Sequence, residues 1–261
     1  MQTYELYKGK ITLSFDEKRH IYSIGGKTVY GVTSITNIIA KPQLIYWAVG
    51  ETVRFLQGVL KAGKSYDEMQ IKSILDQASQ QHCKSKGEAA DMGTMIHDWI
   101  SSFLKAGLAK KPLPTLPVNE EMRNIVRAFL GWAKEKKVKF ISTERKVYSK
   151  RYNYAGTLDA EAMIDGKLAV VDFKTGNAIY PEYCLQAVAY LNALKEEEKK
   201  RYAGGAYIVR FSKEDKQKNI CPFEVMKVGS LKVHLEAFLA CHRMYQWRMW
   251  QRRKDIKANL K

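Results

Sequence analysis

Apolar and polar residues alternate along the first forty residues and again in several segments of the second half of the chain. Ile11, Leu13 and Phe15 have the two-residue period of a half-buried strand, and Gly25-Gly26 has the composition of a tight hairpin turn. The later segments with strand character are residues 138–148, 158–164, 168–173, 205–211 and 222–228. The pattern therefore predicts β structure in both halves of the sequence, including an N-terminal β-hairpin.

Helical periodicity fills the region between these strands. Residues 43–108 carry apolar positions every three to four residues, in three pieces that are separated near Gly63 and near Lys86-Gly87. Further helices are predicted at residues 120–136, 181–200 and 231–257. Because helices and strands are mixed in this order, we predict an α/β fold in which helices flank a central mixed β-sheet.

The length of 261 residues fits one large domain. We expect four consecutive parts within it: an N-terminal β extension (1–40), a helical region (43–136), a sheet core (138–230) and a C-terminal helix (231–261). The charged run at residues 195–201 is interpreted as the solvated end of a helix.

The segment that carries most chemical information is a predicted β-hairpin around Asp165-Gly166. This dipeptide favours a two-residue turn because both positions tolerate positive φ. If these two residues form the loop, Ile164 pairs with Lys167. The same count places Asp159 opposite Asp172, with side chains roughly 4.5–5.5 Å apart at Cβ. The hairpin is therefore expected to bring two carboxylates together.

Lys174 adds a positive charge to this pair. It follows Asp172 by two residues, so it projects from the same face of the strand. The opposite face is uniformly apolar and consists of Leu158, Ala160, Ala162, Ile164, Ala169, Val171 and Phe173. Like charges that face each other are destabilising without a cation. We therefore favour a hydrolytic metal site over the alternative of a solvated strand end.

The formal charge is +17, from 44 basic and 27 acidic residues. An excess of this size is typical of proteins that bind an acidic polymer, either nucleic acid or an anionic membrane surface. No apolar run approaches the ~20 residues of a membrane span, and the N-terminal residues lack the apolar stretch of a signal peptide. The composition therefore favours a cytoplasmic protein that contacts nucleic acid rather than a membrane.

Residues 58–65, GVLKAGKS, match a phosphate-binding loop, and residues 168–172, LAVVD, are similar to the strand that supplies the magnesium aspartate in such ATPases. That loop requires a buried strand directly before it. The preceding residues instead have helical spacing, with Gly63 suited to a helix C-cap and Ser65-x-x-Glu68 to a capping box. We favour a helix–turn–helix and expect no ATP requirement; the alternative is an ATPase.

Four further residues carry little meaning alone. His97 lies at the edge of an apolar helix face, where a packed histidine is more common than a metal ligand. Glu144 on a predicted strand is compatible with a surface charge. Gln186 and Tyr190 are one helical turn apart and project side by side.

The C-terminal helix mixes aromatic and basic residues, namely Arg243, Tyr245, Trp247, Arg248, Trp250, Arg252 and Arg253. Two interpretations remain open. The aromatic rings could stack on nucleic-acid bases, or the helix could belong to the core with a solvated basic flank.

Five elements, in the order of the chain, resemble the RecB-type exonuclease branch of the PD-(D/E)XK nuclease superfamily. They are G-T-x-x-H at residues 93–97, Glu144, A-G-T-L-D at residues 155–159, V-D-F-K-T-G at residues 171–176 and Q-x-x-x-Y at residues 186–190. The N-terminal segment GVTSI also looks like that of phage-type members. The resemblance implies a restriction-endonuclease-like core and metal-dependent cleavage of DNA.

The resemblance also implies roles for the matching residues. Asp159 and Asp172 would bind one or two Mg²⁺ or Mn²⁺ ions, which prefer oxygen ligands. His97 and the backbone carbonyl of Phe173 would complete the ligand set. Lys174 would orient or deprotonate the attacking water and stabilise charge on the scissile phosphate. The other implied residues are Glu144, near a second ion or its waters, and Thr157, Thr175, Gln186 and Tyr190, which would brace the site or contact DNA.

Cysteine usage departs from part of this branch. The four cysteines are widely spaced and fit small buried hydrophobic residues, and they are Cys83, Cys184, Cys221 and Cys241. Iron–sulfur members of the branch have a tight cysteine cluster near the C-terminus, whereas the last two cysteines here are twenty residues apart. We therefore predict no iron–sulfur cluster.

We predict a metal-dependent DNA exonuclease that acts on single strands or duplex ends in DNA recombination, repair or processing, in the cytoplasm of a bacterial or phage-infected cell. The alternatives are a structure-specific endonuclease on the same fold and a DNA-binding module with a vestigial site. The complete set of Asp159, Asp172 and Lys174 argues against the module. No helicase motif fits the remaining chain, so any helicase or recombination partner would be a separate protein.

Overall fold

The structure is a computed structural model that describes residues 1–212 and 222–259, with the side chains of all of these except residues 82, 85–92 and 256–259. The chain divides into two compact units, one formed by residues 1–39 together with 96–261 and the other by residues 40–95. The sequence predicts a single domain without this division. Each unit is described by itself below.

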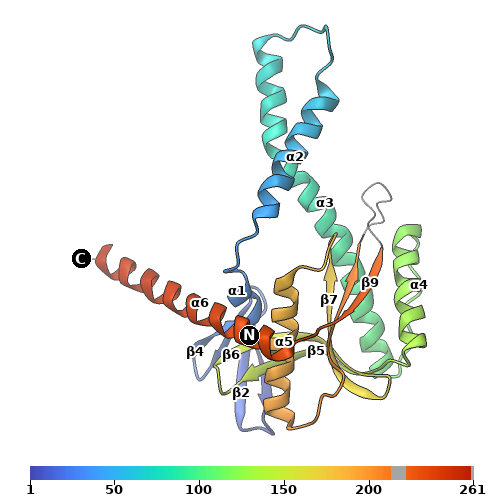
Figure 1. The fold of residues 1–261 in the computed structure, drawn as a ribbon, viewed down its shortest axis with the longest axis vertical. Coiled ribbons are helices and arrows are strands. Elements are labelled where there is room, and N and C mark those ends of the chain that lie inside the picture. The colour runs from blue at the N-terminus through green and yellow to red at the C-terminus, as the bar shows by residue number, and fades with distance from the viewer. Residues whose placement is uncertain (213–221, 260–261) are drawn as a thin grey trace. The chain divides into compact units, whose positions relative to one another are not determined.

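The larger unit contains one β-sheet, which has nine strands in the described part of the chain (Figure 1). Eight strands follow each other in the order β1-β2-β3-β4-β6-β7-β8-β9, and β5 pairs with β6. The strands are β1 (Gln2–Leu6), β2 (Ile11–Asp16), β3 (Ile21–Ile24), β4 (Lys27–Gly31), β5 (Lys139–Ser149), β6 (Tyr154–Ile164), β7 (Lys167–Thr175), β8 (Gly205–Phe211) and β9 (Phe223–Lys227).

The N-terminal strands are part of this sheet. Strands β1 to β4 form an antiparallel meander. Gly25 and Gly26 both have positive φ, as the predicted hairpin turn requires. Strand β4 then pairs in parallel with β6 through Tyr30 and Gly31. The meander therefore extends the main sheet, whereas the sequence predicts only a hairpin added to it.

The β6–β7 hairpin has the predicted register. Asp165 and Gly166 have positive φ, and Ile164 pairs with Lys167. All seven residues of the predicted apolar face are buried. The antiparallel pairing ends at Ala160 and Val171, one residue before the two aspartates. The strands therefore separate where the site begins.

Helices cover both faces of the sheet, as the sequence predicts. On one face, α5 (Pro181–Glu198) packs against strands β5 to β8 and against α1 (Val32–Thr36) and α6 (Leu231–Asn259). On the other face, α4 (Glu120–Glu135) contributes Phe129, whose ring contacts the rings of Phe173 and Phe211. This arrangement is consistent with a restriction-endonuclease-like fold.

The smaller unit consists of α2 (Pro42–Val59) and the first part of α3 (Glu68–Leu108). Helix α3 continues through Lys86-Gly87, so the predicted break at this position is wrong. A single glycine costs a helix only about 1 kcal/mol relative to alanine, which is too little to end a long helix. None of the helices in the described residues is long and apolar enough to cross a membrane.

The helix–turn–helix at residues 58–65 is confirmed, with two local corrections. Helix α2 precedes Leu60, its C-cap, so no strand leads into the loop, and Gly63 has positive φ in the turn beyond the cap. The capping box is formed by Asp67 and Gln70. The backbone N–H of Gln70 donates to Asp67 Oδ1 at 2.7 Å, and that of Asp67 donates to Gln70 Oε1 at 3.2 Å. The predicted Ser65–Glu68 capping box is therefore wrong by two residues.

Candidate active site

Asp172 is the most buried charged group of the site. It lies on β7 with 1% of its surface exposed, and its Oδ2 is 2.7 Å from Lys174 Nζ. Apart from this ion pair, Oδ2 has no hydrogen-bond partner among the described residues. Burial raises the pKa of Asp172 to about 7; the charge of Lys174 opposes this rise and that of Asp159 adds to it. This carboxylate has capacity for a further cation.

Asp159 lies beside it at the end of the β6–β7 pairing. Its Oδ2 accepts a hydrogen bond from the backbone N–H of Phe173 at 2.8 Å, and its Oδ1 is 3.8 Å from His97 Nε2. The interaction with Asp159 raises the pKa of His97, although burial lowers it. The predicted register is observed, but the antiparallel pairing ends at Ala160 and Val171, so Asp159 and Asp172 are not a direct cross-strand pair.

Glu144 joins the same region from β5. Its backbone has a φ of 51°, which is uncommon outside glycine. Its carboxylate accepts from Ser101 Oγ at 2.6 Å and pairs with Lys105 Nζ at 2.6 Å. Burial raises the pKa of Glu144, but the hydrogen bonds from Lys105 and Ser101 outweigh it, and the net shift is downward. Glu144 is therefore held as an ionised, oriented carboxylate.

Helix α3 supplies three of the groups in this region. His97, Ser101 and Lys105 are spaced by four residues, which places them on one face of the helix. This spacing is a signal from which Ser101 and Lys105 could have been found. Sequence reasoning missed both residues because neither has a recognisable motif.

A cavity of about 390 Å³ connects these groups. Its lining includes the five predicted polar side chains His97, Glu144, Asp159, Asp172 and Lys174 together with Thr157, Phe173 and Tyr190. Thr157 Oγ1 is hydrogen-bonded to the Tyr22 hydroxyl at 2.8 Å. The structure thus brings together eight of the ten predicted site residues. Thr175 is solvent-exposed, and neither it nor Gln186 lines this cavity.

The N-terminal strands contribute a wall of the cavity that sequence reasoning missed. Lys146 on β5 lies 4.5 Å from the ring centre of Phe15 and 5.4 Å from that of Tyr4. No carboxylate lies within ion-pair distance of its ammonium in the described part of the chain, and burial lowers its pKa. His20 packs against Phe15 and Tyr22 beside it. The cavity therefore contains a cation suited to an anionic ligand.

Gln186 and Tyr190 extend from α5 toward α1 and β6. Gln186 Nε2 donates to Thr36 Oγ1 at 2.8 Å, which ties α5 to α1. The ring of Tyr190 lies against Gly156 of β6: a methyl group at Gly156 would be 2.5 Å from Tyr190 Cε1 and 3.2 Å from Val32 Cγ2. Gly156 is therefore required for close packing next to Thr157 rather than for an unusual φ.

Gly156→Ala is expected to lower the free energy of unfolding by about 1–3 kcal/mol, the usual cost of overpacking a core. Urea denaturation would measure this change. Gly131→Ala is the matched control, because no atom lies within 4 Å of its added methyl group and its helical position favours alanine. Equal stability of the Gly156 variant and the wild type would show that Tyr190 is not packed as described.

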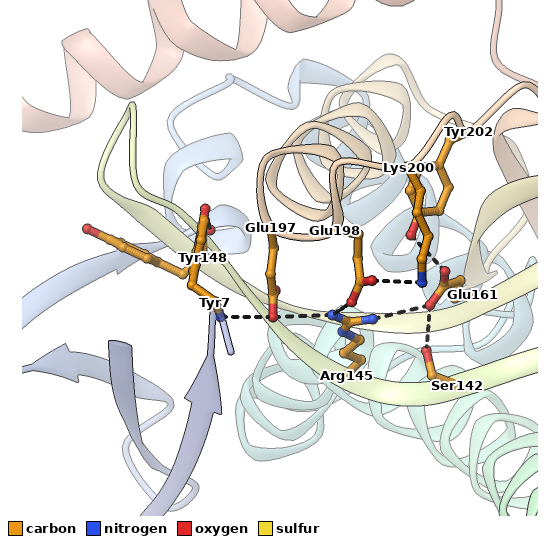
Figure 2. A network of polar contacts seen from close by, with 9 residues as sticks. All are labelled: Tyr7, Ser142, Arg145, Tyr148, Glu161, Glu197, Glu198, Lys200 and Tyr202. Carbon is orange, nitrogen blue, oxygen red and sulfur yellow. Dashed lines mark hydrogen bonds and ion pairs between the residues drawn. The ribbon is translucent and has the colours of Figure 1, made fainter. Parts of the chain in front are cut away.

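Strand β5 is anchored by a charge network on the residue after Glu144 (Figure 2). Arg145 Nη1 is 3.3 Å from Glu161 Oε2, and its Nη2 is 3.3 Å from Glu197 Oε1 and bonded to Glu198 Oε1. The Tyr202 hydroxyl donates to Glu161 Oε1 at 2.7 Å. Carboxylates from the end of α5 are therefore bound to the sheet. The interpretation of residues 195–201 as a solvated helix end is wrong for its glutamates, whereas the basic residues of the run are exposed as predicted.

The donor set fits a hard divalent ion. Asp172 Oδ2 and Asp159 Oδ1 are carboxylate oxygens in a polar cavity, and the first of them has no hydrogen-bond donor. No group of three His, Cys, Asp or Glu side chains converges on a metal-sized position in the residues described. Two carboxylates suffice for Mg²⁺, which keeps several waters.

The sequence predicts that the cysteines are small buried residues. Cys184 is buried as expected and Cys241 is half-buried, but Cys83 is exposed, so the prediction is wrong for Cys83. Cys221 lies outside the described residues.

Comparisons with known proteins give only remote similarity. No known protein family and no curated protein matches the chain. Among solved structures, SSO0001 is similar with 12% identity and a TM-score of 0.27 over 48% of this chain, which spans 57% of the length of SSO0001. An alkaline exonuclease (LHK-Exo) from Laribacter hongkongensis is similar with 10% identity and a TM-score of 0.28, over 82% of this chain and 99% of that one. The structure of LHK-Exo in complex with dAMP is similar with 13% identity and a TM-score of 0.33, over 62% of this chain and 85% of that one.

Proposed function

We propose that this protein is a metal-dependent DNA nuclease that acts as an exonuclease on single strands or duplex ends. The observation that carries the proposal is Asp172, a buried carboxylate with an oxygen that lacks a hydrogen-bond donor, beside Lys174 and Asp159 in one cavity. Lys174 supplies one positive charge for the two neighbouring carboxylates Asp159 and Asp172, and a bound cation would offset the remaining negative charge, which is costly to bury. The net charge of +17 supports a polyanionic substrate.

In the proposed reaction Asp159 and Asp172 hold Mg²⁺ or Mn²⁺, with the Phe173 carbonyl and His97 as further ligands. A bound ion of this type lowers the pKa of its water and polarises the phosphate. Lys174 orients the attacking water and stabilises negative charge that develops on the scissile phosphate. Glu144, which is paired with Lys105, would bind a second ion or the waters of that ion.

Two surrounding groups support these roles. The centre of the Tyr183 ring lies 5.3 Å from Lys174 Nζ, so the ring forms a cation–π contact with the ammonium. Lys146 offers a second positive charge in the cavity for a neighbouring phosphate of the same strand. Neither side chain belongs to a motif, and we propose both as additions to the predicted site.

Incubation of the purified protein with end-labelled linear DNA and closed circular DNA, in Mn²⁺ or in EDTA, tests the proposal. We expect degradation of the linear DNA alone, only with Mn²⁺ and without ATP. Lys64→Ala is the control for the phosphate-loop alternative and should degrade DNA at the wild-type rate. Cleavage of the circular DNA would favour the endonuclease, and binding without any cleavage would favour a DNA-binding module.

A further inference from the structure

Helix α6 presents two tryptophans to solvent. Trp247 is 54% exposed and Trp250 is 50% exposed. The buried side of the same helix carries Phe238, His242 and Tyr245, which contact the rings of Tyr154 or Tyr30. The exposure of both tryptophans excludes the interpretation of this part of α6 as a core helix. Packing within the unit therefore does not account for the positions of these two large exposed rings.

The two rings belong to a stripe with a cation at each end. Arg243, Trp247, Trp250 and Lys254 are separated by four, three and four residues, which aligns them along one face of a helix. Lys254 Nζ lies 3.9 Å from the ring centre of Trp250. We call these four residues the α6 stripe. Figure 1 shows that this half of α6 extends beyond the strands β4 and β6 of its own unit.

The surroundings of the α6 stripe are strongly basic. Residues 240–254 contain no Asp or Glu, and the exposed residues next to the stripe include Arg248, Arg252 and Arg253. The apolar side of α6 packs inside the unit, and from residue 240 to residue 255 Met244 is the one large apolar side chain that is exposed besides the two tryptophans. This exposed apolar face is narrower than the one with which an amphipathic helix enters a membrane. Isolated rings flanked by guanidinium groups match the alternating bases and phosphates of a single strand.

We propose that the α6 stripe binds single-stranded nucleic acid, with Trp247 and Trp250 stacked on successive bases and the flanking cations on phosphates. The proposal rests on the proposed nuclease function and specifies its substrate as a strand with unpaired bases. The first half of α6 packs on α1 and α5, which carry the cavity-lining residues Thr33 and Tyr190. The stripe and the cavity therefore belong to the same unit.

Fluorescence anisotropy with a labelled oligothymidylate, in EDTA so that no cleavage occurs, tests the proposal. The double variant Trp247→Leu/Trp250→Leu keeps apolar side chains but removes the stacking surface, and we expect its Kd to rise at least tenfold, since stacking is worth about 5- to 150-fold per base. Trp247→Phe/Trp250→Phe keeps the rings and should bind within about threefold of wild type. Tyr46→Leu, at another exposed aromatic residue, is the control and should bind like wild type.

Three further readouts separate the alternatives. Binding to fully paired DNA should change little in the leucine variant, because its bases are not accessible for stacking. Equal binding of oligothymidylate by the leucine variant and wild type would overturn the proposal, as would loss of binding to phosphatidylserine vesicles without loss of nucleic-acid binding. Retained stacking with no cleavage in Mn²⁺ would instead contradict only the nuclease function. Thermal melting should be the same for both tryptophan variants, because the rings are exposed.

Discussion

Lys174→Met is expected to reduce the rate of DNA cleavage by about two to three orders of magnitude, the usual effect of removing one group that stabilises transition-state charge. Both carboxylates remain, so the divalent ion still binds and still raises the melting temperature. A gel-based cleavage assay and thermal melts with and without Mn²⁺ measure these two effects separately. Lys167→Met, at the exposed start of the same strand, is the matched control and should cleave DNA normally.

Asp172→Asn is expected to differ from the lysine variant in stability. Burial raises the pKa of Asp172 from 3.8 to about 7. In the metal-free protein, its contribution to stability is therefore fully present below pH 4 and is lost as the pH rises through 7. Asparagine avoids this loss, so the metal-free variant should be at least as stable as wild type at pH 8.

Wild-type turnover in the Lys174→Met variant would mean that the β6–β7 hairpin is not the active site.

Arg145→Ala should cause the largest loss of stability among the variants that we propose. The substitution leaves Glu161, which is 2% exposed, without its cation. It also removes one partner each from Glu197 and Glu198, of which Glu198 keeps its ion pair with Lys200. Removal of one partner from a buried ion network costs about 3–5 kcal/mol. For a chain of this size that corresponds to a fall in melting temperature of roughly 6–20 °C. Urea denaturation of the metal-free protein measures the effect directly.

The control for this variant is Arg151→Ala. The Arg151 side chain lies over the ring of Tyr152, and only its backbone N–H bonds to Glu196, so its truncation should change the unfolding free energy by less than about 0.5 kcal/mol. Arg145→Lys keeps one charge but loses the planar fork that contacts several carboxylates, and an intermediate loss is expected. If Arg145→Ala melts like wild type, the three glutamates do not form the described network.

The central part of the site could be predicted because a short turn fixes a long register. Asp165-Gly166 specifies the pairing of Ile164 with Lys167, and simple counting then brings the two aspartates to the same end of the hairpin. The side-chain alternation of a strand adds Lys174 without further information. Counting did not predict that the pairing ends at Ala160 and Val171, or that Asp159 accepts a hydrogen bond from the backbone N–H of Phe173.

Contacts between distant segments could not be predicted in this way. The Glu144–Lys105 pair joins a strand to a helix 39 positions earlier in the sequence, and the wall at Lys146 depends on where the N-terminal meander joins the sheet. The charged run at residues 195–201 has the composition of a solvated segment. Its role depends on Arg145, which lies opposite only after β5 and α5 have packed together.

The most direct test of the account is a calorimetric titration of Mn²⁺ into the wild-type protein and into Asp172→Asn, without DNA. We predict saturable binding to the wild type and its loss in the variant, because the buried carboxylate is the group with capacity for a cation. Absence of saturable binding to the wild type, or unchanged binding to Asp172→Asn, would contradict a metal-dependent site on this hairpin.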